Sequence, residues 1–140
     1  MKIYIIHASS HPDYKKNIYE IIRTSALVEN HEIIFPHEMS EASIKSKGII
    51  SSSDLIIAEV SYPSIGVGVE LGWAEVDNRK ILFIHKEGIK PSSSLSVISS
   101  DFIEYTTPDD MVQKLSRWIE ENDYNLIKKC NKDLNLIVQK

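Results

Sequence analysis

Short β-branched runs alternate with amphipathic helical patterns along most of this chain, and this alternation restricts the fold more than any other feature. Strands are predicted at 2–7, 32–35, 54–60, 80–85 and 102–105, and helices at 12–29, 38–51, 66–77 and 108–120. The strand runs, such as Ile3-Tyr4-Ile5-Ile6, are apolar at successive positions, which is typical of a parallel sheet covered on both faces. The sequence therefore predicts a doubly wound α/β domain with about five parallel strands.

The size and composition of the chain fit one folded domain. Its 140 residues are 42% hydrophobic and 26% charged, which supplies enough apolar side chains for a packed core. The formal net charge is −4 and neither half of the chain is basic, so a nucleic acid polymer is not an expected partner. We expect residues 1–121 to form the domain. Residues 122–140 are expected to form an amphipathic helical tail of the same domain, with apolar positions at Leu126, Ile127, Cys130 and Leu134.

The sequence also predicts a cytoplasmic location without a membrane partner. Its apolar stretches fall far short of the roughly 18–20 residues that span a bilayer, and the first residues lack a secretory signal pattern. Cys130 is the single cysteine, so it cannot form an internal disulfide. The five histidines form no metal-ligand pair on one helix face, so we expect neither a metal nor a cofactor: His7, His11, His31, His37 and His85.

The loop after the third predicted strand carries the strongest candidate for chemistry. In an open α/β sheet, ligands bind outside the carboxyl ends of the strands, where loops lead into helix N-termini. Here Ser64, Gly66 and Gly68 supply a hydroxyl, bare backbone and free N–H groups, which favour an anion such as phosphate. A Gly-x-Gly pair also serves plain turns and close packing, so the pair alone is a weak signal.

Two side chains on the following helix add to this hypothesis. Glu70 is expected in the first turn of this helix, where the helix dipole stabilises a carboxylate that can reach a ligand of the loop. Trp73 lies three residues further on the same face and could stack on a flat base. The alternatives are an ordinary helix-favouring acid for Glu70 and a core aromatic for Trp73.

A longer run of motifs surrounds these residues. It reads Ala58-Glu59-Val60, Pro63-Ser64-Ile65-Gly66-Val67-Gly68 and Glu70-Leu71-Gly72, and a second segment reads Leu95-Ser96-Val97-Ile98. Together with Tyr4 near the end of the first strand, these motifs resemble the nucleoside 2-deoxyribosyltransferase superfamily, and they are most similar to its 2'-deoxynucleoside 5'-monophosphate N-hydrolase branch. The resemblance covers residues 2 to 120 and implies a flavodoxin-like sheet.

The resemblance implies a role for each matching position. Glu70 would be the nucleophile that attacks the anomeric carbon of the sugar, so that the base leaves and a covalent glycosyl-enzyme forms. Ser64 and the backbone through Gly66 and Gly68 would hold the 5'-phosphate, and Tyr4 would lie beside the sugar. Ser96 would complete the phosphate site of the neighbouring subunit, which implies a homodimer or a higher even oligomer.

Two positions depart from the family pattern. The family usually carries an aspartate near the departing base, eight residues before the position of Asp54, where this chain has Ser46. The loop after the first strand, usually glycine-serine-x-arginine, reads His7-Ala8-Ser9-Ser10-His11. Ser9 and Ser10 could donate hydrogen bonds to phosphate in place of the arginine, and either histidine could supply charge or a proton. His7 or Glu59 could replace the acid if either points into the site, although a histidine at a strand end is more often structural.

The expected function is cleavage of the N-glycosidic bond of a (deoxy)nucleoside 5'-monophosphate. One alternative is a transferase that hands the sugar of a free nucleoside to a second base. The other is a nucleotide-binding or sensor module with weak or lost catalysis, because Ser46 stands where the family keeps its acid.

Overall fold

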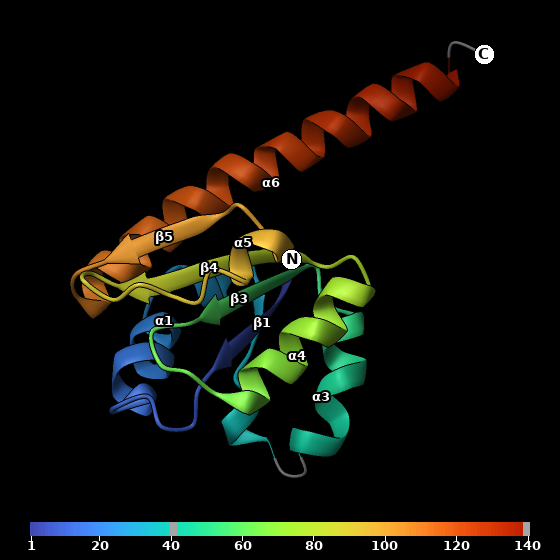
Figure 1. The fold of residues 1–140 in the computed structure, drawn as a ribbon. Coiled ribbons are helices and arrows are strands. Elements are labelled where there is room, and N and C mark those ends of the chain that lie inside the picture. Colours follow the sequence, from blue (N-terminus) through green and yellow to red (C-terminus); the bar gives the residue numbers. More distant parts are fainter. Residues whose placement is uncertain (40–41, 139–140) are drawn as a thin grey trace.

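The protein folds around one five-stranded sheet. The computed structural model describes residues 1–39 and 42–138, with side chains over 1–39 and 46–123. All neighbouring strands are parallel, in the order β2-β1-β3-β4-β5 (Figure 1). This is the doubly wound, flavodoxin-like sheet that the sequence predicts, so that prediction is confirmed. The strands are β1 (Lys2–His7), β2 (Glu32–Ile34), β3 (Leu55–Glu59), β4 (Lys80–Lys86) and β5 (Phe102–Tyr105).

Helices cover both faces of the sheet. They are the π-helix η1 (Lys15–Glu20), α1 (Ile21–Arg23), α2 (Leu27–Asn30), the 3-10 turn η2 (Pro36–Glu38), α3 (Ala42–Ser51), α4 (Ile65–Val76), α5 (Leu95–Ile98) and α6 (Pro108–Val138). One core cluster packs η1, α1 and α6 on the first face, and a second packs α3 and α4 on the other. None of these helices, over the ranges just given, is long and apolar enough to cross a membrane.

The alternation of side chains along the strands decides what each face receives. On β1, Ile3 and Ile5 point to the η1 and α6 face, whereas Tyr4 points to the face of α3 and α4. His7 and Glu59 are register partners at the ends of β1 and β3. The chain leaves β1 toward β2 on one side and β3 lies on the other, so the carboxyl ends of these two strands form the switch point where ligands bind in such sheets.

Three predicted helices differ from those observed. The helix expected over 12–29 begins only at Lys15, because Asp13 takes a left-handed backbone (φ 45°) and its carbonyl accepts the N–H of Lys16. It is also interrupted between Arg23 and Leu27. The helix expected over 38–51 is α3, which begins at Ala42 after the η2 turn.

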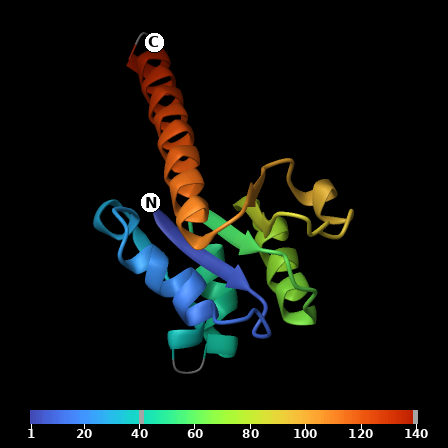
Figure 2. The same cartoon turned by 90° about the vertical axis from the view of Figure 1, so that its left-hand side faces the viewer.

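The third difference concerns the C-terminal region. The helix expected over 108–120 runs on to Val138 as α6, so it continues through the segment predicted to be a separate tail. Its second half extends beyond the sheet (Figure 2). The apolar positions predicted for the tail, from Leu126 to Leu134, lie outside the described side chains.

Candidate functional site

The first turn of α4 faces the carboxyl edge of the sheet with an open backbone. Ser64 caps the helix: its hydroxyl accepts the N–H of Val67 (3.4 Å) and its carbonyl accepts that of Gly68 (3.2 Å). The N–H groups of Ile65 and Gly66 have no acceptor among the described residues. A Cβ atom added at Gly66 would meet only the Ser64 hydroxyl at 3.7 Å, and one at Gly68 would meet nothing within 4 Å. Packing within this chain therefore does not require these two glycines, and the space beside them is available to a ligand.

Glu70 lies one turn further along α4 and is half-buried. The prediction that it lies in the first turn is wrong, because α4 already begins at Ile65. Burial raises the pKa of its carboxyl group to about 7. Within the part of the chain that the structure describes, no group donates a hydrogen bond to this carboxylate or forms an ion pair with it. A desolvated and unpaired carboxylate of this kind is available either as a nucleophile or as a proton donor.

Tyr4 lies within range of the charge of Glu70, and Ser46 interacts with Tyr4. Tyr4 is fully buried on β1, and its pKa is raised first by burial and then by the charge of Glu70. Ser46 of α3 is 4% exposed and interacts with the Tyr4 phenol, whose pKa it lowers. The contact with Ser46 does not have the geometry of a hydrogen bond, and the Tyr4 hydroxyl makes no hydrogen bond to the described residues. The structure thus brings together the positions at which the resemblance expects the nucleophile, the sugar neighbour and the missing acid.

His7 belongs to an aromatic cluster on the opposite face, formed by His7, Tyr14, Tyr19 and His37. Its Nδ1 donates to the Ala8 carbonyl (2.8 Å), so its Nε2 accepts the Tyr19 hydroxyl (2.6 Å). Burial lowers the pKa of His7 to about 4, so the ring is neutral at pH 7. A neutral histidine with both nitrogens engaged does not favour the role of proton donor that the sequence left open for it.

The rest of the aromatic cluster packs around His7 at the end of β1. The rings of Tyr14 and His37 lie 4.5 and 4.4 Å from that of His7, between centroids. The pKa of Tyr19 is raised by burial and also, to a smaller degree, by the charge of Glu70. Sequence reasoning missed Tyr14, Tyr19 and His37, because only the packing of η1 and η2 on the end of β1 reveals that they gather around His7.

Glu59 anchors a second buried group, the Glu59 cluster, which consists of His11, Glu59, Ser61 and Tyr105. Its carboxylate accepts from His11 Nε2 (2.9 Å), from the Ser61 N–H (2.5 Å) and from the Tyr105 hydroxyl. Burial alone would raise the pKa of Glu59, but these hydrogen bonds outweigh it and lower the pKa. Glu59 is therefore a hydrogen-bonded anion, which suits a structural carboxylate better than a proton donor.

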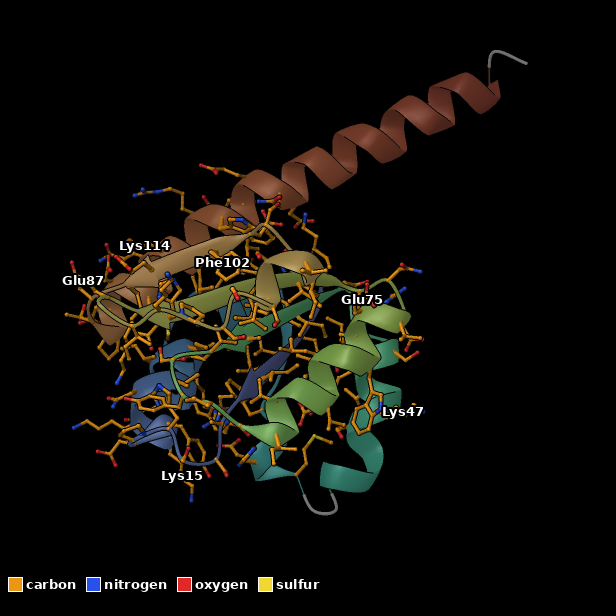
Figure 3. All side chains as sticks on the ribbon, in the orientation of Figure 1. Lys15, Lys47, Glu75, Glu87, Phe102 and Lys114 are labelled. Atoms are coloured by element: carbon orange, nitrogen blue, oxygen red, sulfur yellow. The ribbon has the colours of Figure 1, made fainter. Side chains whose placement is uncertain are left out.

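The remaining predicted site residues lie at the surface or in packing positions. Ser9 and Ser10 are exposed in the loop after β1, and Ser96 is exposed on α5, where its hydroxyl donates to the Ser93 carbonyl (2.7 Å). Trp73 packs against the core cluster of α3 and α4, with Lys47 Nζ 6.0 Å from its ring centroid; Figure 3 labels Lys47 on this side of the molecule. This environment favours the core interpretation of Trp73.

A cavity of about 410 Å³ lies between the first turn of α4 and the segment that leads into α5. Its lining includes Ser64, Val67, Leu71, Lys90, Ser94 and Leu95. It touches the cap of α4 but is mainly apolar. Among the side chains that the structure describes, no group of three or more histidine, cysteine, aspartate or glutamate residues could hold a metal ion.

Comparison with known proteins gives a local sequence match. No family model matches the chain. A protein of Syntrophotalea carbinolica, with the provisional name 2'-deoxynucleoside 5'-phosphate N-hydrolase 1, is 43% identical over 51 residues. The match spans 36% of this chain and 36% of that protein, about a third of its length.

Solved structures share the fold over most of the chain. A CMP N-glycosidase of Clostridium botulinum superimposes with a TM-score of 0.66 and 24% identity, over 84% of this chain and 99% of that one. A 2-deoxyribosyltransferase of Bacillus psychrosaccharolyticus does so with a TM-score of 0.58 and 15% identity, over 80% and 90% of the two chains. The local sequence match supports the resemblance to the nucleoside 2-deoxyribosyltransferase superfamily that the motifs indicate, and the solved neighbours confirm its fold.

Proposed function

We propose that this protein is an enzyme that cleaves the N-glycosidic bond of a (deoxy)nucleoside 5'-monophosphate, with Glu70 as the nucleophile. The observation that carries the proposal is the half-buried carboxylate of Glu70, which has no hydrogen-bond or ion-pair partner among the described side chains and whose charge reaches the buried phenol of Tyr4. The ionised carboxylate attacks the anomeric carbon while the carbon–nitrogen bond breaks, and the base leaves with the bonding pair and takes up a proton from solvent. Water then attacks the glycosyl ester and returns a proton to solvent, which releases the sugar phosphate and restores the Glu70 carboxylate.

The first turn of α4 suits the 5'-phosphate. It combines the N–H groups of Ile65 and Gly66, which have no acceptor among the described residues, with the positive end of the helix dipole and the Ser64 hydroxyl. Packing does not require Gly66 or Gly68, so the space beside their backbone is open to the phosphate. Ser9 and Ser10, from the loop after the neighbouring strand, can add hydroxyl donors. Binding energy from the phosphate would orient the sugar toward Glu70 without taking part in the chemistry.

The proposed active unit is a homodimer in which Ser96 of one subunit reaches the phosphate site of the other. Support comes from the outer face of α4, where three large apolar side chains are exposed: Ile65 (90%), Val69 (46%) and Val76 (76%). Their spacing places them on one stripe of the helix. Val97, which follows Ser96 on α5, is 88% exposed. Apolar surface of this kind fits a self-complementary interface between two copies, and Val76→Lys should weaken dimerisation in sedimentation experiments without unfolding the protein.

Product analysis tests the reaction. The purified protein is incubated with a panel of nucleosides and 5'-monophosphates, with and without a free acceptor base. Free base without an acceptor supports the proposed hydrolysis, whereas exchange that requires the acceptor identifies the transferase instead. Binding without either product contradicts the enzyme and supports the binding module, for which the presence of Ser46 in place of an acid is the specific observation.

A further inference from the structure

The loop between β1 and η1 has an exposed tip on a buried base. Ser9 and Ser10 form the tip of a turn that the His11 N–H closes on the Ala8 carbonyl (3.1 Å). Ala8 and His11 at its base are 2% and 3% exposed. The two hydroxyls therefore stand in solvent on a short turn whose ends are fixed in the core.

The Glu59 cluster attaches this base to the sheet. His11 Nδ1 faces the Pro12 carbonyl (3.0 Å) and His11 Nε2 faces Glu59 Oε2 (2.9 Å). A carbonyl oxygen and an ionised carboxylate only accept hydrogen bonds, so both ring nitrogens must carry protons. His11 and Glu59 thus form a buried ion pair, with side chains 1% and 0% exposed.

The cluster joins three strand ends at the edge where the ligand is expected. Glu59 ends β3, Tyr105 ends β5, and His11 follows β1, which pairs directly with β3. The Ser61 N–H holds the second carboxylate oxygen, at the start of the loop that leads to Ser64. The same carboxylate therefore fixes the loop that carries Ser9 and Ser10 relative to the loop that caps α4.

We propose that His11 and Glu59 are positioning residues that hold the Ser9 and Ser10 hydroxyls against the 5'-phosphate at the first turn of α4. The inference rests on the proposed function for the identity of the ligand. In this arrangement a buried histidine does not contact the phosphate but orients the two serines that do. Phosphate recognition then depends on an ion pair that lies inside the protein.

Binding measurements in the Glu70→Gln protein test the proposal, because that variant binds without consuming its ligand. Calorimetry compares the tightest-binding nucleoside 5'-monophosphate of a panel with the matching nucleoside. We expect His11→Gln to weaken monophosphate binding about tenfold and to leave nucleoside binding within about twofold. His85→Gln is the matched control, because His85 is also buried near a strand end and its Nδ1 also faces a backbone carbonyl, that of Lys86. This control variant should change neither affinity.

A double-mutant cycle separates positioning from a general structural role. If His11 acts through the two hydroxyls, His11→Gln should have no further effect in a background of Ser9→Ala and Ser10→Ala. Independent effects, equal losses for nucleoside and monophosphate, or absence of monophosphate binding would overturn the proposal. Monophosphate binding with the expected cycle but no release of base by the unmutated protein would reject the proposed hydrolysis and leave the positioning role intact.

Should His11→Gln fail to fold, nitrogen NMR of the unmutated protein decides instead. A proton on each ring nitrogen of His11 would support the ion pair that the two facing acceptors require, and an unprotonated Nε2 would overturn the ion pair and the proposal with it.

Discussion

The carboxylate of Glu70 and the hydroxyl of Tyr4 lie so close that the charge of the one raises the pKa of the other. They come from different elements, β1 and α4, on the face of the sheet that α3 and α4 cover. Because the phenol stays protonated, it can act only as a neutral hydrogen-bonding group beside the carboxylate. A neutral donor next to a poorly solvated anion suits a nucleophile that must approach a sugar.

The pH dependence of turnover should identify the role of Glu70. Its pKa of about 7 means that the ionised form gains population as the pH rises through neutrality. The pH profile of kcat/KM reports the ionisation of the free enzyme, so if Glu70 is the nucleophile, kcat/KM should rise through about pH 7 and then level off. Rates that fall over this range would assign Glu70 the role of proton donor. Glu70→Gln should remove turnover by orders of magnitude while ligand binding persists.

Glu70 should also leave a signature in protein stability. In the folded protein the pKa of Glu70 lies above its ordinary value of 4.5. The protonated carboxyl group therefore contributes to the free energy of unfolding below pH 4.5, and this contribution is lost as the pH rises through about 7. Since the group is only half-buried, solvent screening reduces the effect, and we expect Glu70→Gln to be more stable than the unmutated protein by about 1–2 kcal/mol at pH 8. The difference should vanish near pH 4, as measured by urea unfolding. An equal difference at both pH values would contradict the raised pKa.

Local patterns predicted the sheet and the position of α4, because strands and helix N-termini depend on residues that are close together in the sequence. Thr107, Pro108 and the acids that follow show this at the start of α6, where the Thr107 hydroxyl accepts the Asp110 N–H (3.1 Å). The same local logic extends to Ser64, whose place after a buried strand makes it the cap of α4.

The Glu59 cluster could not be predicted in this way. His11 and Glu59 are 48 positions apart, and they meet because β1 and β3 pair in one register and because the turn after β1, closed by the His11 N–H on the Ala8 carbonyl, holds His11 at the strand ends. The sequence left His11 open as a source of charge or of a proton in the site, whereas folding buries its ring against the Glu59 carboxylate. Such pairings depend on tertiary geometry, which a single sequence does not display.

Tyr4→Phe should separate activity from stability. The substitution keeps the ring in the core and removes a buried hydroxyl that has no hydrogen bond of good geometry to the described side chains. We expect the unfolding temperature to stay the same or to rise by a few degrees, since an unsatisfied buried group costs about 1 kcal/mol or more. Turnover should fall, mainly in kcat, because the neutral group beside Glu70 is lost. A marked loss of stability would show that the hydroxyl has an essential structural partner.

Ser46→Asp tests whether the departure from the family pattern limits catalysis. Ser46 is buried next to Tyr4, so a carboxyl group there would lie near Glu70 and would be poorly solvated. We expect a stability cost of about 1–3 kcal/mol together with faster turnover of substrates that have poor leaving groups. The measurement is the ratio of kcat/KM for two 5'-monophosphates, one with a good and one with a poor leaving base, incubated together with the variant. Unchanged or slower turnover of both would indicate that another group supplies the proton.

Ser64→Ala and Ser96→Ala should both weaken the binding of 5'-monophosphates, by about 1–2 kcal/mol each, and hardly affect nucleosides. Only Ser64→Ala should also lower stability, by about 0.5–1 kcal/mol, because the Ser64 hydroxyl caps α4 whereas Ser96 is exposed on a single helical turn. Calorimetry and thermal unfolding measure the two effects separately. A loss of nucleoside binding in either variant would contradict the assignment to phosphate.

Mixing subunits shows whether Ser96 acts across the dimer. In a heterodimer that pairs a Glu70→Ala subunit with a Ser96→Ala subunit, action in trans places both lesions in one pocket and leaves the other pocket intact. Measured with the 5'-monophosphate well below KM, where the Ser96→Ala loss of binding shows, such a heterodimer should have about half of the normal activity per dimer, whereas each variant homodimer has two damaged pockets. If Ser96 serves its own chain, every pocket of the heterodimer carries one lesion and mixing restores nothing. A protein that sediments as a monomer at micromolar concentration would rule out the shared site before any kinetic measurement.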